Sequence, residues 1–334
     1  MLRMKLFFAL LSLAMFYSGI ISAQSQTTQN DHAGLAKFEF ALIGDVPYIK
    51  SDYPKFDRVI NEINADNKLK WVLHAGDIKS GSSPCSDELF HDRLKRFQRF
   101  NIPFILTPGD NEWTDCHRVA AGSYSPLERL ARLREVFYPL AGETLGKTTM
   151  SVMSQANYPH YPEFVENVRW MKNHVMFATL HIVGSNNGWA PFSTRTRADN
   201  NEVARRTAAG LSWLRQTFDE ALAHNARGVF LLFQANPNFE LNKKSSKRRG
   251  FNEILKALEQ ESIRFDKPII LAHGDTHQFR VDKPLFDRVS NFRLENVTRV
   301  ETFGVPDVHW IRVVVDPNSP EVFTIHPEII EQNL

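Results

Sequence analysis

Four apolar runs of the chain each end in a glycine followed by an aspartate. They are FALIGD ending at Asp45, WVLHAGD at Asp77, FILTPGD at Asp110 and IILAHGD at Asp275. One Gly-Asp pair often marks only a turn or a helix cap, but an aspartate that follows a buried strand stands where α/β proteins place their chemistry. Carboxylates gathered at one edge of a sheet repel one another, and hard divalent cations with oxygen ligands relieve that repulsion. The fourfold pattern therefore predicts a metal site.

The elements before these aspartates alternate between strand and helix. The pattern predicts strands at 38–44, 71–75 and 104–107, with helices at 51–66 and 86–100 between them. Short connections between such elements imply that the strands pair in parallel.

The second half of the chain repeats this alternation after a looser, aromatic stretch at 145–174. A helix is predicted at 125–137, and strands and helices then follow at 173–185, 202–225, 228–237, 251–259 and 268–277. Apolar and polar residues alternate at 308–317 and 321–329, which is typical of antiparallel strands. The composition, with 43% hydrophobic residues and no low-complexity linker, predicts one large α/β domain over residues 37–330.

The first 23 residues have the layout of a secretory signal peptide. Arg3 and Lys5 precede an apolar run that ends in Ser22-Ala23, and a polar tail at 24–36 follows. A membrane anchor is the alternative, but the run is short and lacks a positively charged stop, so we expect export to the periplasm or the medium and no stable membrane anchor. Cleavage removes two basic residues and brings the formal charge from +2 to 0, which gives no indication of a nucleic-acid partner.

The chain has two cysteines, Cys85 and Cys116, each in a segment that follows a Gly-Asp pair. An even cysteine count in an exported protein favours a disulfide. Because adjacent parallel strands place their following loops side by side, we expect these two residues to be bonded to each other.

In their order and spacing the motifs resemble those of the calcineurin-like metallophosphoesterases, which include the purple acid phosphatases. The family pattern is Asp-x-His, Gly-Asp, Gly-Asn-His-Asp/Glu, a lone histidine after a strand, and Gly-His-x-His. The corresponding places here hold Asp45-Val46-Pro47, Gly76-Asp77, Gly109-Asp110-Asn111-Glu112, Gln234 and Gly274-Asp275-Thr276-His277. The resemblance covers about residues 38–326. It implies two β-sheets packed face to face and flanked by helices.

The resemblance also implies two divalent metal ions and a ligand for each family position. Asp77 would bridge the metals, Asp45 and His277 would complete one site, and the other would be held by Asp110, Gln234 and Asp275. Proline cannot ligate, so the place of the family's first histidine is lost at Pro47. This set is rich in oxygen and retains one imidazole, which favours manganese, magnesium or calcium over zinc.

In the family the metals activate a hydroxide that attacks the phosphorus, and a histidine protonates the leaving group. That histidine is replaced here by Asn111, whose amide can hydrogen-bond a phosphate oxygen but cannot deliver a proton. His117 is the nearest substitute, and a surface histidine explains it equally well. His74 and His273 each precede a Gly-Asp pair and are better explained as buried histidines without a metal.

The leading hypothesis is an exported, metal-dependent phosphoesterase with a phosphate-ester substrate. The rival hypothesis is a binding or structural protein on the same scaffold that has lost catalysis through its changes at Pro47, Asn111 and Gln234. The residues at 110, 234 and 275 still offer oxygen, which favours the enzyme. The basic run KKSSKRR at 243–249 is either a solvated loop or a border of the site that attracts anions.

Overall fold

The computed structural model of this protein describes residues 35–334. The predicted signal peptide and most of the predicted polar tail lie outside the described residues. Over the described range, no helix combines the length and the apolar character needed to span a membrane.

A five-stranded sheet carries three of the four Gly-Asp pairs. Its order is β12-β11-β1-β2-β3, with parallel pairing from β1 to β2 to β3 and antiparallel pairing of β11 with both β1 and β12. The strands are β1 (Phe38–Ile43), β2 (Leu69–His74), β3 (Phe104–Leu106), β11 (Trp310–Val315) and β12 (Phe323–Glu328). This pairing confirms both the parallel first half and the antiparallel C-terminal strands that the sequence predicts.

A seven-stranded sheet carries the fourth pair, in the order β4-β5-β6-β7-β8-β10-β9. Its strands are β4 (Met153–Ser154), β5 (Val168–Lys172), β6 (Val175–Thr179), β7 (Gly228–Leu232), β8 (Ile269–His273), β9 (Arg280–Asp282) and β10 (Val297–Glu301). The four central strands, β6, β7, β8 and β10, are parallel.

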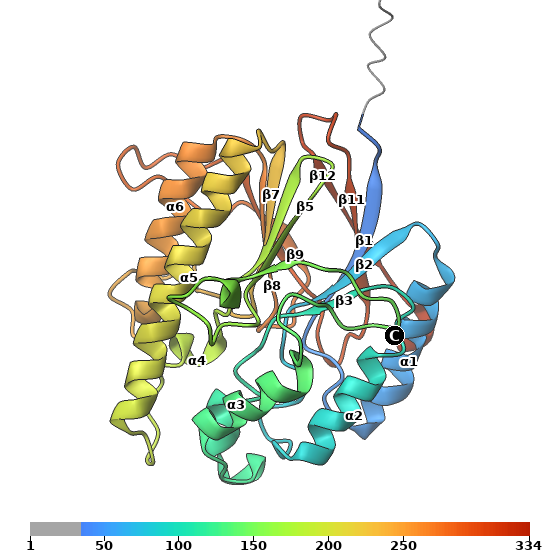
Figure 1. Cartoon of the computed structure of the whole chain (residues 1–334), viewed down its shortest axis with the longest axis vertical. Coiled ribbons are helices and arrows are strands. Elements are labelled where there is room, and N and C mark those ends of the chain that lie inside the picture. The colour runs from blue at the N-terminus through green and yellow to red at the C-terminus, as the bar shows by residue number, and fades with distance from the viewer. Residues whose placement is uncertain (1–34) are drawn as a thin grey trace, which may run out of the picture. The chain divides into compact units, whose positions relative to one another are not determined.

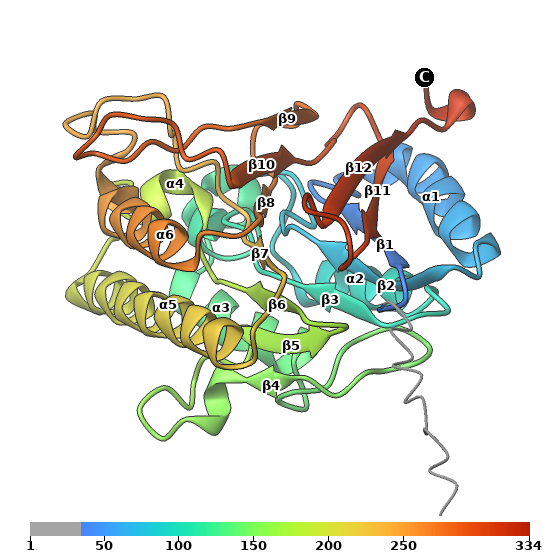
Figure 2. The same ribbon diagram turned by 90° about the horizontal axis from the view of Figure 1, so that it is seen from above.

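Helices cover the outer face of each sheet, as Figures 1 and 2 show. They are α1 (Tyr53–Ala65), α2 (Asp87–Phe97), α3 (Pro126–Phe137), the single turn α4 (Gly184–Asn187), α5 (Arg197–Ala223) and α6 (Asn252–Phe265). One core joins α1, α2 and α3 to the five-stranded sheet, and a second joins α5 and α6 to the seven-stranded sheet. The two-sheet sandwich flanked by helices, implied by the resemblance, is confirmed.

The alternation of side chains along β1 explains how one strand serves two cores. Phe40 and Leu42 point between the sheets, where Phe40 packs edge-on against Phe177 and Phe230 of the opposite sheet. Ala41 and Ile43 point the other way, into the core under the helices. Successive residues of a strand face opposite sides, so a strand that is buried on both faces reads as a continuous apolar run.

Several elements differ from the sequence prediction, and α6, for example, ends at Phe265 rather than near Glu259. Helix α5 begins at Arg197 rather than near Glu202, because Thr196 forms a capping box with Asp199: its backbone N–H donates to the Asp199 carboxylate at 2.7 Å. The aromatic stretch at 145–174 contains the short strand β5, which pairs antiparallel with β6. Its pattern was too irregular to predict because Arg169 lies on the helix-covered face, over the Trp213 ring of α5.

Candidate metal centre

The four predicted aspartates follow the carboxyl ends of β1, β2, β3 and β8. The structure brings them together from two sheets rather than along the edge of one. The backbone N–H of Asp275, after β8, donates to both carboxylate oxygens of Asp45, after β1, at 3.1 and 3.2 Å. Asp45, Asp77 and Asp110 are buried and Asp275 is half-buried. The sheets therefore meet at this point through their aspartate loops.

The glycine before each aspartate has a steric cause. A Cβ atom at Gly109 would lie 2.0 Å from Oδ1 of Asp77, and one at Gly274 would lie 2.2 Å from Oδ2 of Asp45. Such distances are far inside van der Waals contact, so only glycine lets these two loops pass the neighbouring carboxylates. A Cβ atom at Gly44 or Gly76 would likewise clash, with Thr302 or with the backbone of Gly109. The recurring Gly-Asp pattern is thus the sequence signature of close packing among the loops.

Asp77 accepts hydrogen bonds from two predicted site residues. The backbone N–H of Asn111 donates to Oδ1 at 3.1 Å, and its side-chain amide donates to Oδ2 at 2.9 Å. The Nε2 of Gln234 also donates to Oδ2, at 3.2 Å. Asp77 is therefore the carboxylate on which the loops after β2, β3 and β7 converge.

Gln234 is held in one orientation by its other contact. Its Oε1 accepts the backbone N–H of Gly184 at 2.7 Å, so the amide nitrogen faces Asp77. Turning the amide over would place two N–H donors against each other at Gly184. In this arrangement Gln234 offers its nitrogen to the aspartates, whereas the predicted ligand role requires its oxygen, and that role stays a prediction.

Ser185, a residue that the sequence alone did not single out, places its hydroxyl between the carboxylates of Asp110 and Asp115. The Oγ of Ser185 lies 2.8 Å from Oδ2 of Asp110 and 2.9 Å from Oδ1 of Asp115. A hydroxyl has one proton, so it cannot donate fully to two carboxylates at once. Ser185, Asn186 and Asn187 all have left-handed backbone conformations, and a run of this kind carries no sequence signal beyond its asparagines.

His277 faces Asp45 and Tyr48. Its Nε2 lies 2.8 Å from the Tyr48 hydroxyl and 3.5 Å from Oδ1 of Asp45, while its Nδ1 lies 2.7 Å from the carbonyl oxygen of Val305. A carbonyl accepts, so Nδ1 carries a proton when the ring is neutral and Nε2 presents its lone pair toward Asp45. That is the tautomer a metal-binding histidine uses.

The remaining histidines have other surroundings. His117 contacts the Thr114 carbonyl through Nδ1 at 2.8 Å and stacks on Phe192, with no hydrogen bond to the four aspartates. Its catalytic role stays a prediction. His74 and His273 are fully buried, their rings bond to backbone atoms, and burial lowers the pKa of each to about 4. Both are therefore neutral core residues.

Two further charged groups complete the cluster. Glu112 is buried and accepts backbone N–H groups from Gly109 at 2.6 Å and Asp77 at 3.2 Å. Lys79, also buried, donates to the carbonyl oxygens of Ser80 and Asn111. A lysine two residues after Asp77 was the available signal for a compensating cation, and the sequence analysis did not use it.

Burial and mutual repulsion raise the pKa of the carboxylates. Burial, with Asp115 nearby, raises the pKa of Asp110 to about 6, and burial with Asp110 nearby raises that of Asp275 to about 7. The pKa values of Asp45 and Asp77 also lie well above the ordinary value, again mainly through burial. Burial lowers the pKa of Lys79 to about 8 despite its acidic neighbours.

The donor chemistry fits hard divalent cations, because the cluster consists of carboxylate oxygens with one imidazole. Across residues 35–334, however, no group of three or more His, Cys, Asp or Glu side chains has the arrangement needed to hold a metal ion. The residues therefore match a metal centre in type and charge, but amide groups donate hydrogen bonds to carboxylate oxygens that a metal would bind.

A disulfide joins the loops after β2 and β3. Cys85 is bonded to Cys116 with their Cα atoms 5.8 Å apart, which confirms the predicted pairing. Both sulfur atoms are fully buried beside Ala121. The bond thus connects the segments that follow Asp77 and Asp110.

We expect the Cys85→Ala/Cys116→Ala variant to lose about 2–4 kcal/mol of unfolding free energy, because the crosslink restricts the unfolded chain across a separation of 31 residues. Urea denaturation of the wild type, with and without reductant, and of the double variant measures this loss. An unchanged midpoint in the double variant, or two free thiols in the non-reduced exported protein by mass spectrometry, would contradict the expectation.

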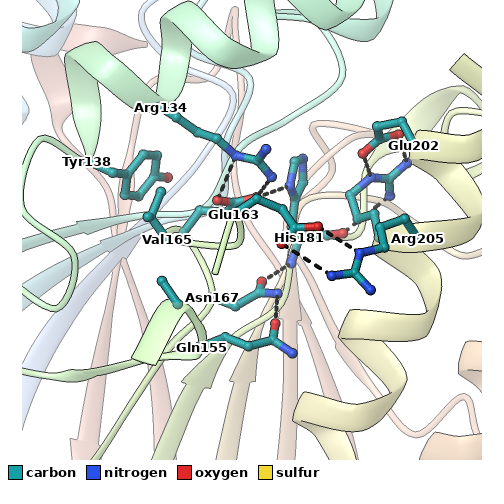
Figure 3. Close-up of polar contacts among 12 residues, drawn as sticks. Arg134, Tyr138, Gln155, Glu163, Val165, Asn167, His181, Glu202 and Arg205 are labelled. Carbon is teal, nitrogen blue, oxygen red and sulfur yellow. Dashed lines mark hydrogen bonds and ion pairs between the residues drawn. The ribbon is translucent and has the colours of Figure 1, made fainter. Parts of the chain in front are cut away.

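A buried ionic network joins α3 to the segments that flank β5 and β6 (Figure 3). Arg134 of α3 donates from Nε to Glu166 at 3.0 Å, and Nδ1 of His181 lies 2.7 Å from the same carboxylate. The His181 ring packs edge-on against Trp113, three residues after Asp110, with ring centroids 5.4 Å apart. Asn167 donates to Gln155 at 2.7 Å beside this network. The network therefore supports the loop that carries Asp110.

Comparison with known proteins agrees with this architecture. The solved structure of PhoD matches with a TM-score of 0.53 and 12% identity over 88% of this chain and 69% of that one, a likeness of fold alone. The structure of GAP50, the anchor in the inner membrane complex of Plasmodium, matches with a TM-score of 0.45 and 11% identity over 88% and 89% of the two chains. None of the curated proteins matches. The model of the calcineurin-like phosphoesterase family matches residues 38–279, most of the chain, and the protein therefore belongs to that family.

Proposed function

We propose that this protein is an exported enzyme that hydrolyses phosphate esters with the help of divalent metal ions. The observation that carries the proposal is the junction of the two sheets, where Asp45 and Asp275 are linked directly and Asp77 gathers the loops after three strands. A buried group of carboxylates is costly without cations between them. Membership of the phosphoesterase family supports the substrate class.

The residues that would hold the metals are Asp45, Asp77, Asp110, Gln234, Asp275 and His277, and Gln234 would bind through its oxygen once its amide turns toward the aspartates. Four carboxylates carry enough negative charge to balance two divalent cations, and they favour manganese, magnesium or calcium. Bound metals of this kind supply an activated hydroxide and polarise the phosphoryl group.

Side chains of the protein would orient the ester and donate a proton to the leaving group. The Asn111 amide, 2.9 Å from Asp77, stands beside the proposed metal position, where it can donate to a phosphate oxygen. Protonation of the leaving group is assigned to His117, because asparagine has no proton of suitable pKa. The Nδ1 of His117 is occupied by the Thr114 carbonyl, which leaves Nε2 for that role.

One observation favours the rival function, a binding protein without catalysis. Asn111 and Gln234 both donate N–H groups to Asp77, so part of the carboxylate is satisfied without a metal. If those hydrogen bonds persist in the functional protein and no metal replaces them, the scaffold binds a partner and performs no hydrolysis.

Metal replacement distinguishes the two functions. We expect protein stripped with a chelator to regain hydrolysis of p-nitrophenyl phosphate with manganese, magnesium or calcium, and about tenfold less with zinc, because the ligands are oxygen-rich. Gln234→His should move the preference toward zinc, and Gln98→His, at an exposed glutamine, should not. Turnover restored by zinc alone would contradict the oxygen-rich site. Folded protein that takes up no metal and hydrolyses neither mono- nor diesters would establish the rival.

Export is a separate part of the proposal and has its own measurement. Residues 1–23 would direct secretion, with cleavage after Ala23. N-terminal sequencing of protein recovered outside the cytoplasm, beginning at Gln24, is the expected result. Recovery of the uncleaved chain from the membrane fraction would indicate the anchor instead.

A further inference from the structure

A loop of five basic residues is connected to the aspartate cluster at Lys247 and just after its last residue. We call residues 242–249 the basic loop; it contains Lys243, Lys244, Lys247, Arg248 and Arg249. It lies between β7 and α6, and Figure 2 shows α4 beside the beginning of α6, where this loop ends. These two connections determine where the backbone of the loop lies.

The first attachment runs through Asp275. The backbone N–H of Asn236 donates to Oδ2 of Asp275 at 2.9 Å, and Asn236 accepts the N–H of Asn238 at 3.0 Å. The side chain of Asn238 then donates to the carbonyl oxygen of Lys247 at 3.1 Å. Three hydrogen bonds therefore connect Asp275 to the middle of the basic loop.

The second attachment runs through Asp110. The backbone N–H of Gly250 donates to Oδ1 of Asn186 at 2.9 Å, and the neighbouring Ser185 contacts Asp110 at 2.8 Å. A Cβ atom at Gly250 would lie 2.1 Å from the Asn186 carbonyl oxygen, so the two segments are in direct backbone contact. The end of the loop is thus fixed against the residue next to Ser185.

The loop has a defined shape, and four of its five basic side chains are exposed. Arg248 donates to the carbonyl oxygen of Phe239 at 3.2 Å, and the N–H of Lys244 donates to Asn242 at 2.9 Å. Lys243, Lys244, Lys247 and Arg249 are exposed, and none forms an ion pair within residues 35–334. A loop whose cations only increase solubility needs no attachment to a buried site, whereas the backbone of this loop is attached to one.

We infer that the basic loop binds the anionic groups of a substrate that carries more than one of them, such as a phosphate ester with a second phosphate. The scissile phosphate would lie at the aspartates, and the additional charge would face the loop. The inference concerns recognition, and it rests on the proposed function only for the hydrolysis of the bound ester. Exposed charges attract anions over about 10 Å at 0.1 M salt, so the effect must weaken as salt rises.

The test compares two variants that each remove four exposed cations. The loop variant is Lys243→Ala/Lys244→Ala/Lys247→Ala/Arg249→Ala, and the matched control is Lys68→Ala/Lys70→Ala/Lys95→Ala/Arg215→Ala. The probe is myo-inositol hexasulfate, a polyanion that phosphoesterases do not hydrolyse, with inorganic sulfate as the single anion. Titration calorimetry on manganese-loaded protein at two salt concentrations gives the affinities.

We expect the loop variant to bind the hexasulfate about tenfold or more weakly, with a smaller salt dependence, and to bind sulfate within about twofold of the wild type. Its KM should rise for a bisphosphate ester and not for the matching monophosphate, with kcat preserved. Equal hexasulfate affinity in the loop and control variants would overturn the inference. So would loss of oligonucleotide or anionic-vesicle binding with hexasulfate binding intact, because the loop would then serve a macromolecule. Hexasulfate binding through the loop without hydrolysis of any ester would refute the proposed enzyme and leave the recognition inference standing.

Discussion

Asp77→Asn is expected to lower turnover by roughly a thousandfold and to remove bound metal, more than the same change at Asp45, Asp110 or Asp275. Asp77 would serve both proposed cations, so its loss would weaken the binding of both, and several kcal/mol of charge stabilisation corresponds to that factor. The measurements are metal content by elemental analysis and initial rates at saturating manganese. Asp219→Asn, at an exposed position on α5, is the control and should retain full activity.

The geometry sharpens this expectation. Within residues 35–334, the three groups that hydrogen-bond to the Asp77 carboxylate are all N–H donors: the backbone and side chain of Asn111, and the amide of Gln234. An asparagine at this position has only one side-chain oxygen to accept these hydrogen bonds. Its NH2 group would replace the other oxygen and would face one of the N–H donors, which is unfavourable. If Asp77→Asn stays folded with full metal content and an unchanged rate, the two-metal interpretation is wrong.

Much of the fold could be predicted because its strands are buried on both faces. β1, β2 and β8 appear in the sequence as continuous apolar runs that end in Gly-Asp. A side chain at each of these glycines would clash with a neighbouring segment: at Gly44 with Thr302, at Gly76 with the backbone of Gly109, and at Gly274 with the carboxylate of Asp45. The same local signals placed Cys85 and Cys116 in adjacent loops, and they are bonded. These local patterns, an apolar run followed by Gly-Asp, therefore predicted the positions of the four aspartates.

The rest of the site depends on contacts between distant segments. Ser185 reaches Asp110 across 75 residues, through a left-handed turn that no periodicity indicates. The orientation of Gln234 is determined by the backbone N–H of Gly184, 50 residues away, so its residue type alone suggested an oxygen ligand. Likewise, a buried Lys79 is recognisable only once its acidic neighbours are located in space.

The buried ionic network around Glu166 yields the second large effect. Arg134→Met should cost about 3–5 kcal/mol of unfolding free energy at pH 7, because Glu166 would be left as an uncompensated buried charge. Burial by itself raises the pKa of Glu166, but the Arg134 charge and the His181 hydrogen bond outweigh it and bring the pKa to about 2. Arg134→Met/Glu166→Gln removes both charges and should recover most of the loss.

The pH dependence separates lost charge compensation from lost packing. In the wild type the pKa of Glu166 is depressed, so its contribution to stability is present above the unfolded value near 4.3 and is lost as the pH falls through about 2. In Arg134→Met burial would raise that pKa, so the variant loses stability as the pH rises above the unfolded value. The difference between the two proteins should therefore grow from pH 3 to pH 7 in urea denaturation curves. A difference that is the same at every pH, and that Glu166→Gln does not recover, would mean that Arg134 acts through the packing of its guanidinium group over the Phe164 ring rather than through its pairing with Glu166.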